Sequence, residues 1–225
     1  MARTKVYNSI KNKKMILNLT EHIKRITTQV SDINEHIPTI IKYGSECNHI
    51  TEMGVRSIVS TWGWLASKPD KLIVYDLQNP NVWGGKLEDV YDTANDLGVD
   101  FKFHKADVLK VEIEPTDLLF IDTMHVHNQL RAELKLHASK VRKYICFHDT
   151  TTFGSRDEVD TARQPDYTWI LDKVSDEIGL WGAIEEFLDD NKEWKIKERF
   201  YNNNGFTILE KHEVGNHSDT NTFSM

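Results

Sequence analysis

Residues 49–60 read HITEMGVRSIVS: a short apolar run that contains Glu52, then Gly54, then a stretch with helical spacing. A strand, a glycine turn and a helix in that order are typical of the first unit of a parallel sheet. Short apolar runs and helical stretches continue to alternate downstream. We therefore predict an α/β fold, a doubly wound and mostly parallel sheet that binds ligands at the carboxyl ends of its strands.

The other elements follow from the positions of the apolar runs. Strands are predicted at His49–Val55, Lys71–Leu77, Phe101–Asp107, Asp117–Thr123 and Lys143–Asp149. Helices are predicted near Ser57–Ser67, Gly85–Leu97, His127–Val141 and Leu180–Asp190. Near the end, Trp194–Tyr201 and Gly205–Lys211 flank three asparagines and predict a terminal antiparallel hairpin.

Residues 1–44 predict a helical cap. Apolar residues recur at spacings of three and four from Ile16 to Ile40, and Pro38 is expected to break or kink the last turn. The flanking positions lack the charges of a coiled coil. We expect the cap to pack on the main domain, residues 45–211, or on a second copy of the chain as a homo-oligomer, and residues 212–225 to be a frayed polar tail.

Composition excludes several classes of protein. The chain has 225 residues, 39% of them hydrophobic, and a net charge of −7 at pH 7. An acidic surface repels phosphate backbones, so duplex nucleic acid is not an expected partner. No run is apolar enough to span a membrane, and the early basic residues predict a solvated arm. With Cys47 and Cys146 expected to be reduced, partly buried thiols, we assign the chain to the cytoplasm.

An acidic residue lies at the end of each predicted parallel strand. Chance would place one or two, because aspartate favours turns, but five successive ones indicate a shared crevice. An acidic rim disfavours phosphates and suits a ligand with ribose hydroxyls, an amino group and a positive charge. A cationic adenosyl ligand meets that demand. The five residues are Glu52, Asp76, Asp107, Asp122 and Asp149.

The pattern resembles class I S-adenosylmethionine-dependent methyltransferases over about residues 45–211. The resemblance implies a Rossmann-like, mostly parallel seven-stranded sheet closed by an antiparallel hairpin. Asp122 with His125, then His148-Asp149, and Asn202–Leu209 are similar to the metal-dependent sugar O-methyltransferases of the macrolide-sugar methyltransferase and cephalosporin hydroxylase-like group. This implies methyl transfer to a hydroxyl of a small molecule, by resemblance a sugar or glycan.

The resemblance also implies which residues hold S-adenosylmethionine. Asp76 is expected to accept hydrogen bonds from the ribose hydroxyls, and Asp107 to face the adenine amino group. The first loop is expected to approach the methionine portion. The implied cofactor-binding residues are Glu52, Gly54, Ser60, Asp76, Asp107 and Asp122.

Each of these acids also has a structural interpretation. Glu52 is suited to cap the following helix, Asp76 to start a turn before Pro80, and Asp107 to be a solvated strand end. The family often has glycines where this chain has Ile58 and Val59. We therefore expect the first loop to lie farther from the cofactor or to adopt another backbone geometry.

Asp122 and Asp149 end adjacent parallel strands, so their carboxylates are expected to converge on one divalent cation, Mg²⁺ or Mn²⁺. The resembling enzymes have two consecutive acids at the second position, where this chain has His148 followed by Asp149. Histidine is a poor ligand for magnesium but acceptable to manganese, iron or zinc. The alternative is that the two acids only cap the segments that follow them.

His125 is the candidate catalytic base. Methyl transfer to an alcohol requires the oxygen to lose its proton, a bound metal lowers the pKa of that hydroxyl, and a nearby histidine accepts the proton. In the macrolide-sugar group the matching histidine is the proposed base. His127 is the rival and is interpreted as a solvated residue at a helix N-terminus.

Aromatic residues and one long connection are the candidates for the acceptor site. Trp62, Trp64 and Trp83 are suited to border the crevice or to lie in the core, and Thr151–Gly179 is long enough for an acceptor-binding lid. Two alternative functions stay open. One is a catalytically silent binding module on the same fold. The other is a nicotinamide-dependent dehydrogenase, disfavoured because Gly54 is not followed by a GxGxxG spacing.

Overall fold

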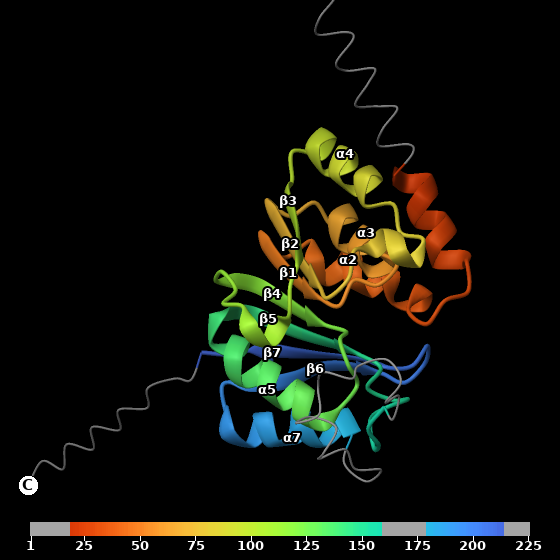
Figure 1. Ribbon diagram of the computed structural model, residues 1–225. Coiled ribbons are helices and arrows are strands. Elements are labelled where there is room, and N and C mark those ends of the chain that lie inside the picture. The colour runs from red at the N-terminus through yellow and green to blue at the C-terminus, as the bar shows by residue number, and fades with distance from the viewer. Residues whose placement is uncertain (1–18, 159–178, 214–225) are drawn as a thin grey trace, which may run out of the picture.

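The computed structural model describes residues 19–158 and 179–213. Its centre is a seven-stranded sheet with the order β3-β2-β1-β4-β5-β7-β6 (Figure 1). Strands β1 to β5 pair in parallel, while β7 pairs antiparallel with both β5 and β6. The strands are β1 His49–Met53, β2 Lys71–Asp76, β3 Asp100–Lys105, β4 Thr116–Ile121, β5 Val141–His148, β6 Trp194–Phe200 and β7 Phe206–Lys211.

The predicted α/β fold and terminal hairpin are therefore confirmed. The chain runs outward from β1 to β3, and then returns to place β4 on the other side of β1. Such a reversal opens a crevice at the carboxyl ends of the two central strands. Of the five acids of the sequence pattern, Glu52 lies within β1 and Asp76 ends β2, whereas Asp107, Asp122 and Asp149 follow β3, β4 and β5.

Helices cover both faces of the sheet (Figure 1). One face carries α2, α3 and α4, and the other carries α5 and α7. Two apolar clusters correspond to these faces, one around Trp64 and Phe120 and one around Leu134 and Phe187. The helices are η1 Asn34–His36, α2 Ile37–Gly44, α3 Val59–Ala66, η2 Pro80–Trp83, α4 Leu87–Leu97, η3 Val108–Lys110, α5 His127–His137, η4 Ala138–Lys140 and α7 Gly179–Asp190.

The N-terminal pattern forms separate helical pieces. Residues 19–28 are helical, the chain then turns, and α2 begins at Ile37. The prediction that Pro38 breaks the last turn is wrong, because Pro38 lies in the first turn of α2, where no amide donor is needed. Ile33, Ile37 and Ile40 are buried in the same cluster as α3 and β1, so this segment packs on the sheet domain.

Cys47 and Cys146 are buried free thiols, as expected. Among residues 19–158 and 179–213, no helix combines the length and apolar character needed to cross a bilayer. Most of the predicted lid, the frayed tail and the basic arm lie outside the described residues.

Candidate functional site

Gly54 allows the ends of β1 and β4 to meet. It has φ +82°, and a Cβ placed on it would lie 1.9 Å from the carbonyl oxygen of Asp122. The Asp122 amide donates to the Met53 carbonyl at 2.8 Å, and the Gly54 amide donates to the Tyr75 carbonyl at 2.9 Å. A side chain at this position would separate the strands. The glycine therefore brings the first loop against the backbone of Asp122, whatever role it has toward a cofactor.

Glu52 lies under that loop, where it is fully buried. Its two carboxyl oxygens accept hydrogen bonds from the Ser60 and Thr61 hydroxyls at 2.5 and 2.7 Å. Burial raises the pKa of Glu52 to about 8. The contacts favour the structural interpretation of Glu52 and Ser60: together they fasten the start of α3 to β1.

We expect the stability of the protein to fall between pH 5 and pH 8 because of Glu52. The folded chain keeps this carboxyl protonated up to about pH 8, whereas the unfolded value is 4.5, so folding takes up a proton in that interval. Glu52→Gln should remove this loss and stabilise the protein at pH 8 by roughly 2–5 kcal/mol. Urea unfolding at both pH values measures it, with Glu88→Gln on the exposed face of α4 as control. An equal pH slope in wild type and Glu52→Gln would contradict the assignment.

The carboxylate of Asp76 accepts hydrogen bonds from backbone amides of the first loop. Its Oδ2 accepts the amides of Val55 and Arg56 at 2.8 and 2.9 Å, and its Oδ1 accepts the amide of Gln78 at 2.8 Å. A carboxylate offers about four acceptor positions, so one direction remains for a ligand. Asp76 thus starts the turn after β2 and also organises the loop. In that loop Arg56 and Ile58 have positive φ values of 43° and 63°.

Asp107 caps the short helix η3. Its Oδ1 accepts the amide of Leu109 at 3.0 Å, and its Oδ2 lies 2.8 Å from the Lys110 ammonium. Its side chain is only 13% exposed, so the alternative of a solvated strand end is wrong.

Three donor groups converge after β4 and β5. Asp122, His148 and Asp149 each offer one ligand atom, and these atoms lie within 4.8 Å of one another. The His148 Nδ1 is 3.3 Å from Asp122 Oδ1 and 3.2 Å from Asp149 Oδ2. Asp149 has φ +59°, and its buried Oδ1 has no hydrogen-bond partner. The fold thus brings together the three residues predicted to hold a metal.

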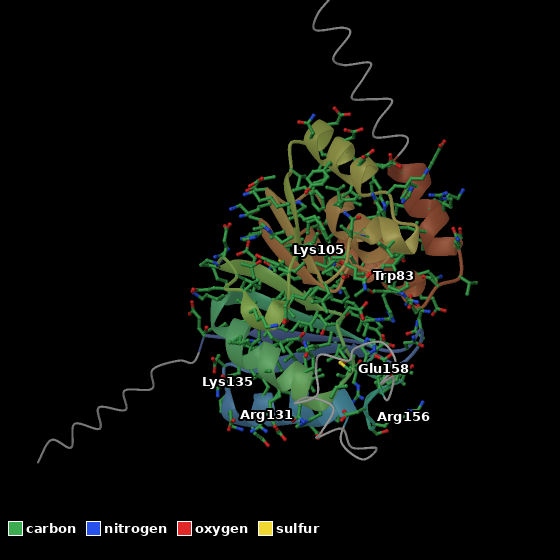
Figure 2. The ribbon with its side chains drawn as sticks, in the orientation of Figure 1. Trp83, Lys105, Arg131, Lys135, Arg156 and Glu158 are labelled. Carbon is green, nitrogen blue, oxygen red and sulfur yellow. The ribbon has the colours of Figure 1, made fainter. Side chains whose placement is uncertain are left out.

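His125 flanks this trio. Its Nε2 lies 2.9 Å from Asp149 Oδ2 and 3.3 Å from Asp122 Oδ1. Its Nδ1 is 2.9 Å from Glu158 Oε2, and the ring of Phe153 stacks on it at 4.8 Å. Glu158 was not among the predicted residues. No motif points to it, because it belongs to the connection after β5, and Figure 2 shows it on the same side as Trp83, where the parallel strands end.

The negative charges of Asp122 and Asp149 must be offset by positive charge in or beside this cluster. Burial alone would lower the pKa of His125 and His148, but the neighbouring carboxylates raise both well above the usual range. Burial alone would likewise raise the pKa of Asp122 and Asp149, but the two imidazoles lower both. Either protonated histidines or a bound cation must therefore offset the carboxylates.

Three further expectations can be compared with the structure. His127 is buried, with its Nε2 3.1 Å from Glu186 Oε1, so its interpretation as a solvated residue is wrong. Trp62 and Trp64 are buried in the apolar cluster with α2 and α3. Trp83, in contrast, is half exposed beside the loop after β2.

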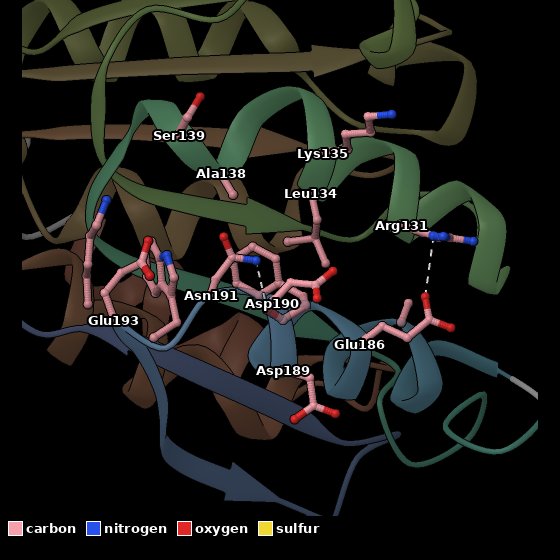
Figure 3. Close-up of a pocket in the computed structure, with 14 residues that line it drawn as sticks. Arg131, Leu134, Lys135, Ala138, Ser139, Glu186, Asp189, Asp190, Asn191 and Glu193 are labelled. Atoms are coloured by element: carbon pink, nitrogen blue, oxygen red, sulfur yellow. Dashed lines mark hydrogen bonds and ion pairs between the residues drawn. The ribbon is translucent and has the colours of Figure 1, made fainter. Parts of the chain in front are cut away.

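A pocket of about 830 Å³ lies between α5 and α7 (Figure 3). Its lining includes apolar Leu134 and Phe187, and at its edge Arg131 Nε lies 3.3 Å from Glu186 Oε2. None of the predicted site residues lines it.

The strand order, with β7 antiparallel to its neighbours, matches the methyltransferase fold. Solved structures with this fold are similar to the chain at low sequence identity. A protein from Staphylococcus aureus described as a caffeoyl-CoA O-methyltransferase has a TM-score of 0.53 and 12% identity, over 87% of this chain and 99% of that one. A Podospora anserina methyltransferase bound to S-adenosylhomocysteine has a TM-score of 0.53 and 15% identity, over 87% and 88%.

A third similar structure is an O-methyltransferase from Bacillus cereus in complex with S-adenosylhomocysteine, with a TM-score of 0.52 and 12% identity over 88% of this chain and 90% of that one. No protein-family model matches the sequence, and no curated protein is significantly similar to it. At these identities the comparisons establish the fold.

Proposed function

We propose that the chain transfers a methyl group from S-adenosylmethionine to a hydroxyl of a small molecule, a sugar or glycan, with the help of a divalent metal. The observation that carries this proposal is the cluster of Asp122, His148 and Asp149 with His125 beside it. It lies at the carboxyl ends of β4 and β5, and β4 is one of the two central strands where the strand order reverses and where open α/β sheets bind ligands. The similar structures named with S-adenosylhomocysteine support the choice of cofactor.

The chain's own residues suit an adenosyl ligand. The Gly54 loop lies against the backbone of Asp122, Asp76 retains one acceptor direction for a ribose hydroxyl, and Asp107 lies two residues after β3. Leu77, directly after Asp76, and Trp83, at the end of η2, are 41% and 50% exposed and present apolar surface. Flat apolar faces bind adenine or sugar rings. Glu52 and Ser60 act beneath the loop as its support.

His125 is the proposed proton acceptor. S-adenosylmethionine supplies a methyl group on a positively charged sulfur, which leaves as a neutral thioether. The acceptor hydroxyl must release its proton as its oxygen bonds to that methyl group. Glu158 accepts a hydrogen bond at His125 Nδ1, which leaves Nε2 as the basic atom on the side of Asp122 and Asp149. This is the arrangement of a base held by an orienting carboxylate.

A divalent metal would be held by Asp122, His148 and Asp149 and would lower the pKa of the acceptor hydroxyl. We expect a chelator to abolish methyl transfer and a divalent cation to restore it. Turnover is measured before and after chelation, with metal content checked by elemental analysis. Full activity in protein confirmed free of metal would contradict the metal role.

A second candidate function is a catalytically silent binding module. The observation that favours it is the occupation of Asp76 by three backbone amides, together with the side chain of Ile58 in a left-handed loop position. Cofactor binding without turnover on any acceptor would support it.

Three further expectations from the sequence stay predictions. They are a cytoplasmic location, domain boundaries at residues 44 and 211, and a homo-oligomer formed through the N-terminal helices.

Asp76→Ala should weaken S-adenosylmethionine binding by about tenfold or more, because hydrogen bonds to a charged acceptor are worth roughly 1.5–3 kcal/mol each. Calorimetry measures the affinity. Since Asp76 also organises the loop, adenosine and its 2′,3′-dideoxy analogue are compared in both proteins. A ribose contact predicts that the wild type prefers adenosine and that the variant loses this preference. An equal loss for both ligands would assign Asp76 to the loop alone.

A further inference from the structure

We propose that the centre formed by Asp122, His148 and Asp149 selects a first-row transition metal, Mn²⁺, Fe²⁺, Co²⁺ or Zn²⁺, over Mg²⁺. The selecting ligand is His148 Nδ1, which backbone carbonyls of two distant segments hold in place. The inference rests on the proposed function only for the presence of a metal at this site, and not on methyl transfer.

The tautomer of His148 follows from its partners. Its Nε2 lies 2.9 Å from the carbonyl oxygen of Asp32 and 3.2 Å from that of Asn203. Carbonyl oxygens only accept hydrogen bonds, so Nε2 must carry the hydrogen. In the neutral ring, the lone pair is then on Nδ1. That atom faces Asp122 Oδ1 and Asp149 Oδ2.

This is the usual arrangement of a metal-binding histidine. Such a ring donates its other N–H to a carbonyl or carboxylate, which fixes its orientation and raises its basicity as a ligand. The side chain of His148 is only 1% exposed, and its Nε2–H lies between two backbone carbonyl oxygens. His148 is thereby presented to the two carboxylates in a single orientation.

The spacing of the donor atoms suits a small cation. Ligands at adjacent positions around a metal with bonds of roughly 2.0–2.2 Å are about 2.9–3.6 Å apart. The two nitrogen–oxygen separations at His148, 3.3 and 3.2 Å, lie in this interval. The Oδ1 of Asp149 is buried without a hydrogen-bond partner, and its side chain is only 7% exposed. A bound cation and its water would satisfy such an oxygen.

The nitrogen ligand decides the metal. Mg²⁺ demands oxygen ligands and gives up its waters reluctantly, whereas imidazole suits Mn²⁺ weakly and Fe²⁺, Co²⁺ and Zn²⁺ well. A site with one buried imidazole between two carboxylates therefore favours these ions. A third carboxylate at residue 148 would favour Mg²⁺ instead.

The two carbonyls belong to segments that are tied to each other. The Asn203 side chain donates to the Ser31 carbonyl at 2.8 Å, and its Oδ1 accepts the amide of Glu35 at 3.0 Å. The N-terminal segment and the β6–β7 turn thus close behind His148 as one unit. Their contacts keep the ring from turning away from the metal position.

The test is metal binding by the full chain, freed of metal by chelation and dialysis. Calorimetry with Mn²⁺, Co²⁺ and Mg²⁺ measures affinity and stoichiometry, and the visible absorption of bound Co²⁺ reports nitrogen ligation. We expect one equivalent of Co²⁺ to bind about 100-fold or more tightly than Mg²⁺, and Mn²⁺ to be preferred over Mg²⁺ by a smaller factor. His148→Asp should reduce this preference at least about tenfold and change the Co²⁺ spectrum.

His137→Gln is the matched control. His137 is another buried histidine whose Nε2 bonds a backbone carbonyl, that of Val108 at 2.8 Å, but it is not part of the metal cluster. Its substitution should leave the metal preference unchanged. If His148→Asp does not fold, the nitrogen signals of ¹⁵N-histidine in the wild type replace it. Zn²⁺ should then shift Nδ1, and not Nε2, of one ring.

The outcomes separate the two proposals. Equal binding of Mg²⁺ and Co²⁺, or Zn²⁺-induced shifts at no histidine Nδ1, would overturn the selection by His148 and leave metal-assisted methyl transfer standing. Failure to bind any of these cations would overturn both the selection and the metal role. S-adenosylmethionine binding, measured in the same preparations, tests the methyltransferase part independently.

Discussion

We expect His125→Ala to lower the rate of methyl transfer by about 10²–10⁴-fold while leaving S-adenosylmethionine affinity nearly unchanged, because it removes the proton acceptor and no predicted cofactor contact. The rate of the wild type should rise with pH through a single ionisation. The carboxylates raise the pKa of His125, so a cation on those carboxylates is needed to free its Nε2 near neutral pH. Initial rates against pH, in protein loaded with metal, measure both effects.

Two variants serve as comparison for His125. Glu158→Gln weakens the orienting contact at Nδ1 and should lower the rate less than His125→Ala does, with a shifted pH profile. His127→Ala removes a buried histidine whose Nε2 lies 3.1 Å from Glu186 Oε1 and which is not part of the metal trio, and it should retain the wild-type pH profile. A large loss in His127→Ala with a near-normal rate in His125→Ala would move the base to α5. A small loss in both would favour a metal-bound oxygen that needs no protein base.

Gly54→Ala should destabilise the protein by about 4 kcal/mol or more, the largest effect on stability that we expect from one methyl group. The new Cβ would lie 1.9 Å from the Asp122 carbonyl oxygen, so the ends of β1 and β4 must separate. This should also displace Asp122 and weaken binding at the metal trio. Urea unfolding measures the stability, and Co²⁺ titration of the folded fraction measures the site.

Gly98→Ala isolates the backbone contribution. Gly98 ends α4 with φ +77°, close to the value at Gly54, but nothing lies within 4 Å of an added Cβ. Its substitution should therefore cost only the left-handed strain, about 1–2 kcal/mol. Equal losses in the two variants would show that the contact between the strand ends is not what requires glycine at residue 54.

The parallel sheet and the gathering of acids at one edge could be predicted from sequence, because both depend on periodicity and on the order of elements along the chain. Alternating strands and helices predict a parallel sheet, and a parallel sheet places its carboxyl ends at one edge. That is why Asp122 and the pair His148-Asp149 could be expected to lie together, although His148 comes 26 positions after Asp122 along the chain. Pro38 was misread because the same residue interrupts a helix or begins one, and only the neighbouring turn decides between the two.

The sequence by itself determined the parallel sheet and the edge of that sheet where the acidic residues gather. It also determined the glycine after β1 and the two histidines next to Asp122 and Asp149. The tertiary structure decided what each group does there. It sends Glu52 beneath the loop to Ser60 and Thr61, joins Glu158 to His125, and places the carbonyls of Asp32 and Asn203 on His148. The physical reason is that periodicity is a local property, whereas these contacts join distant segments. The contacts to His148 use backbone carbonyl oxygens, which every residue type possesses, so no pattern of residue types can predict them.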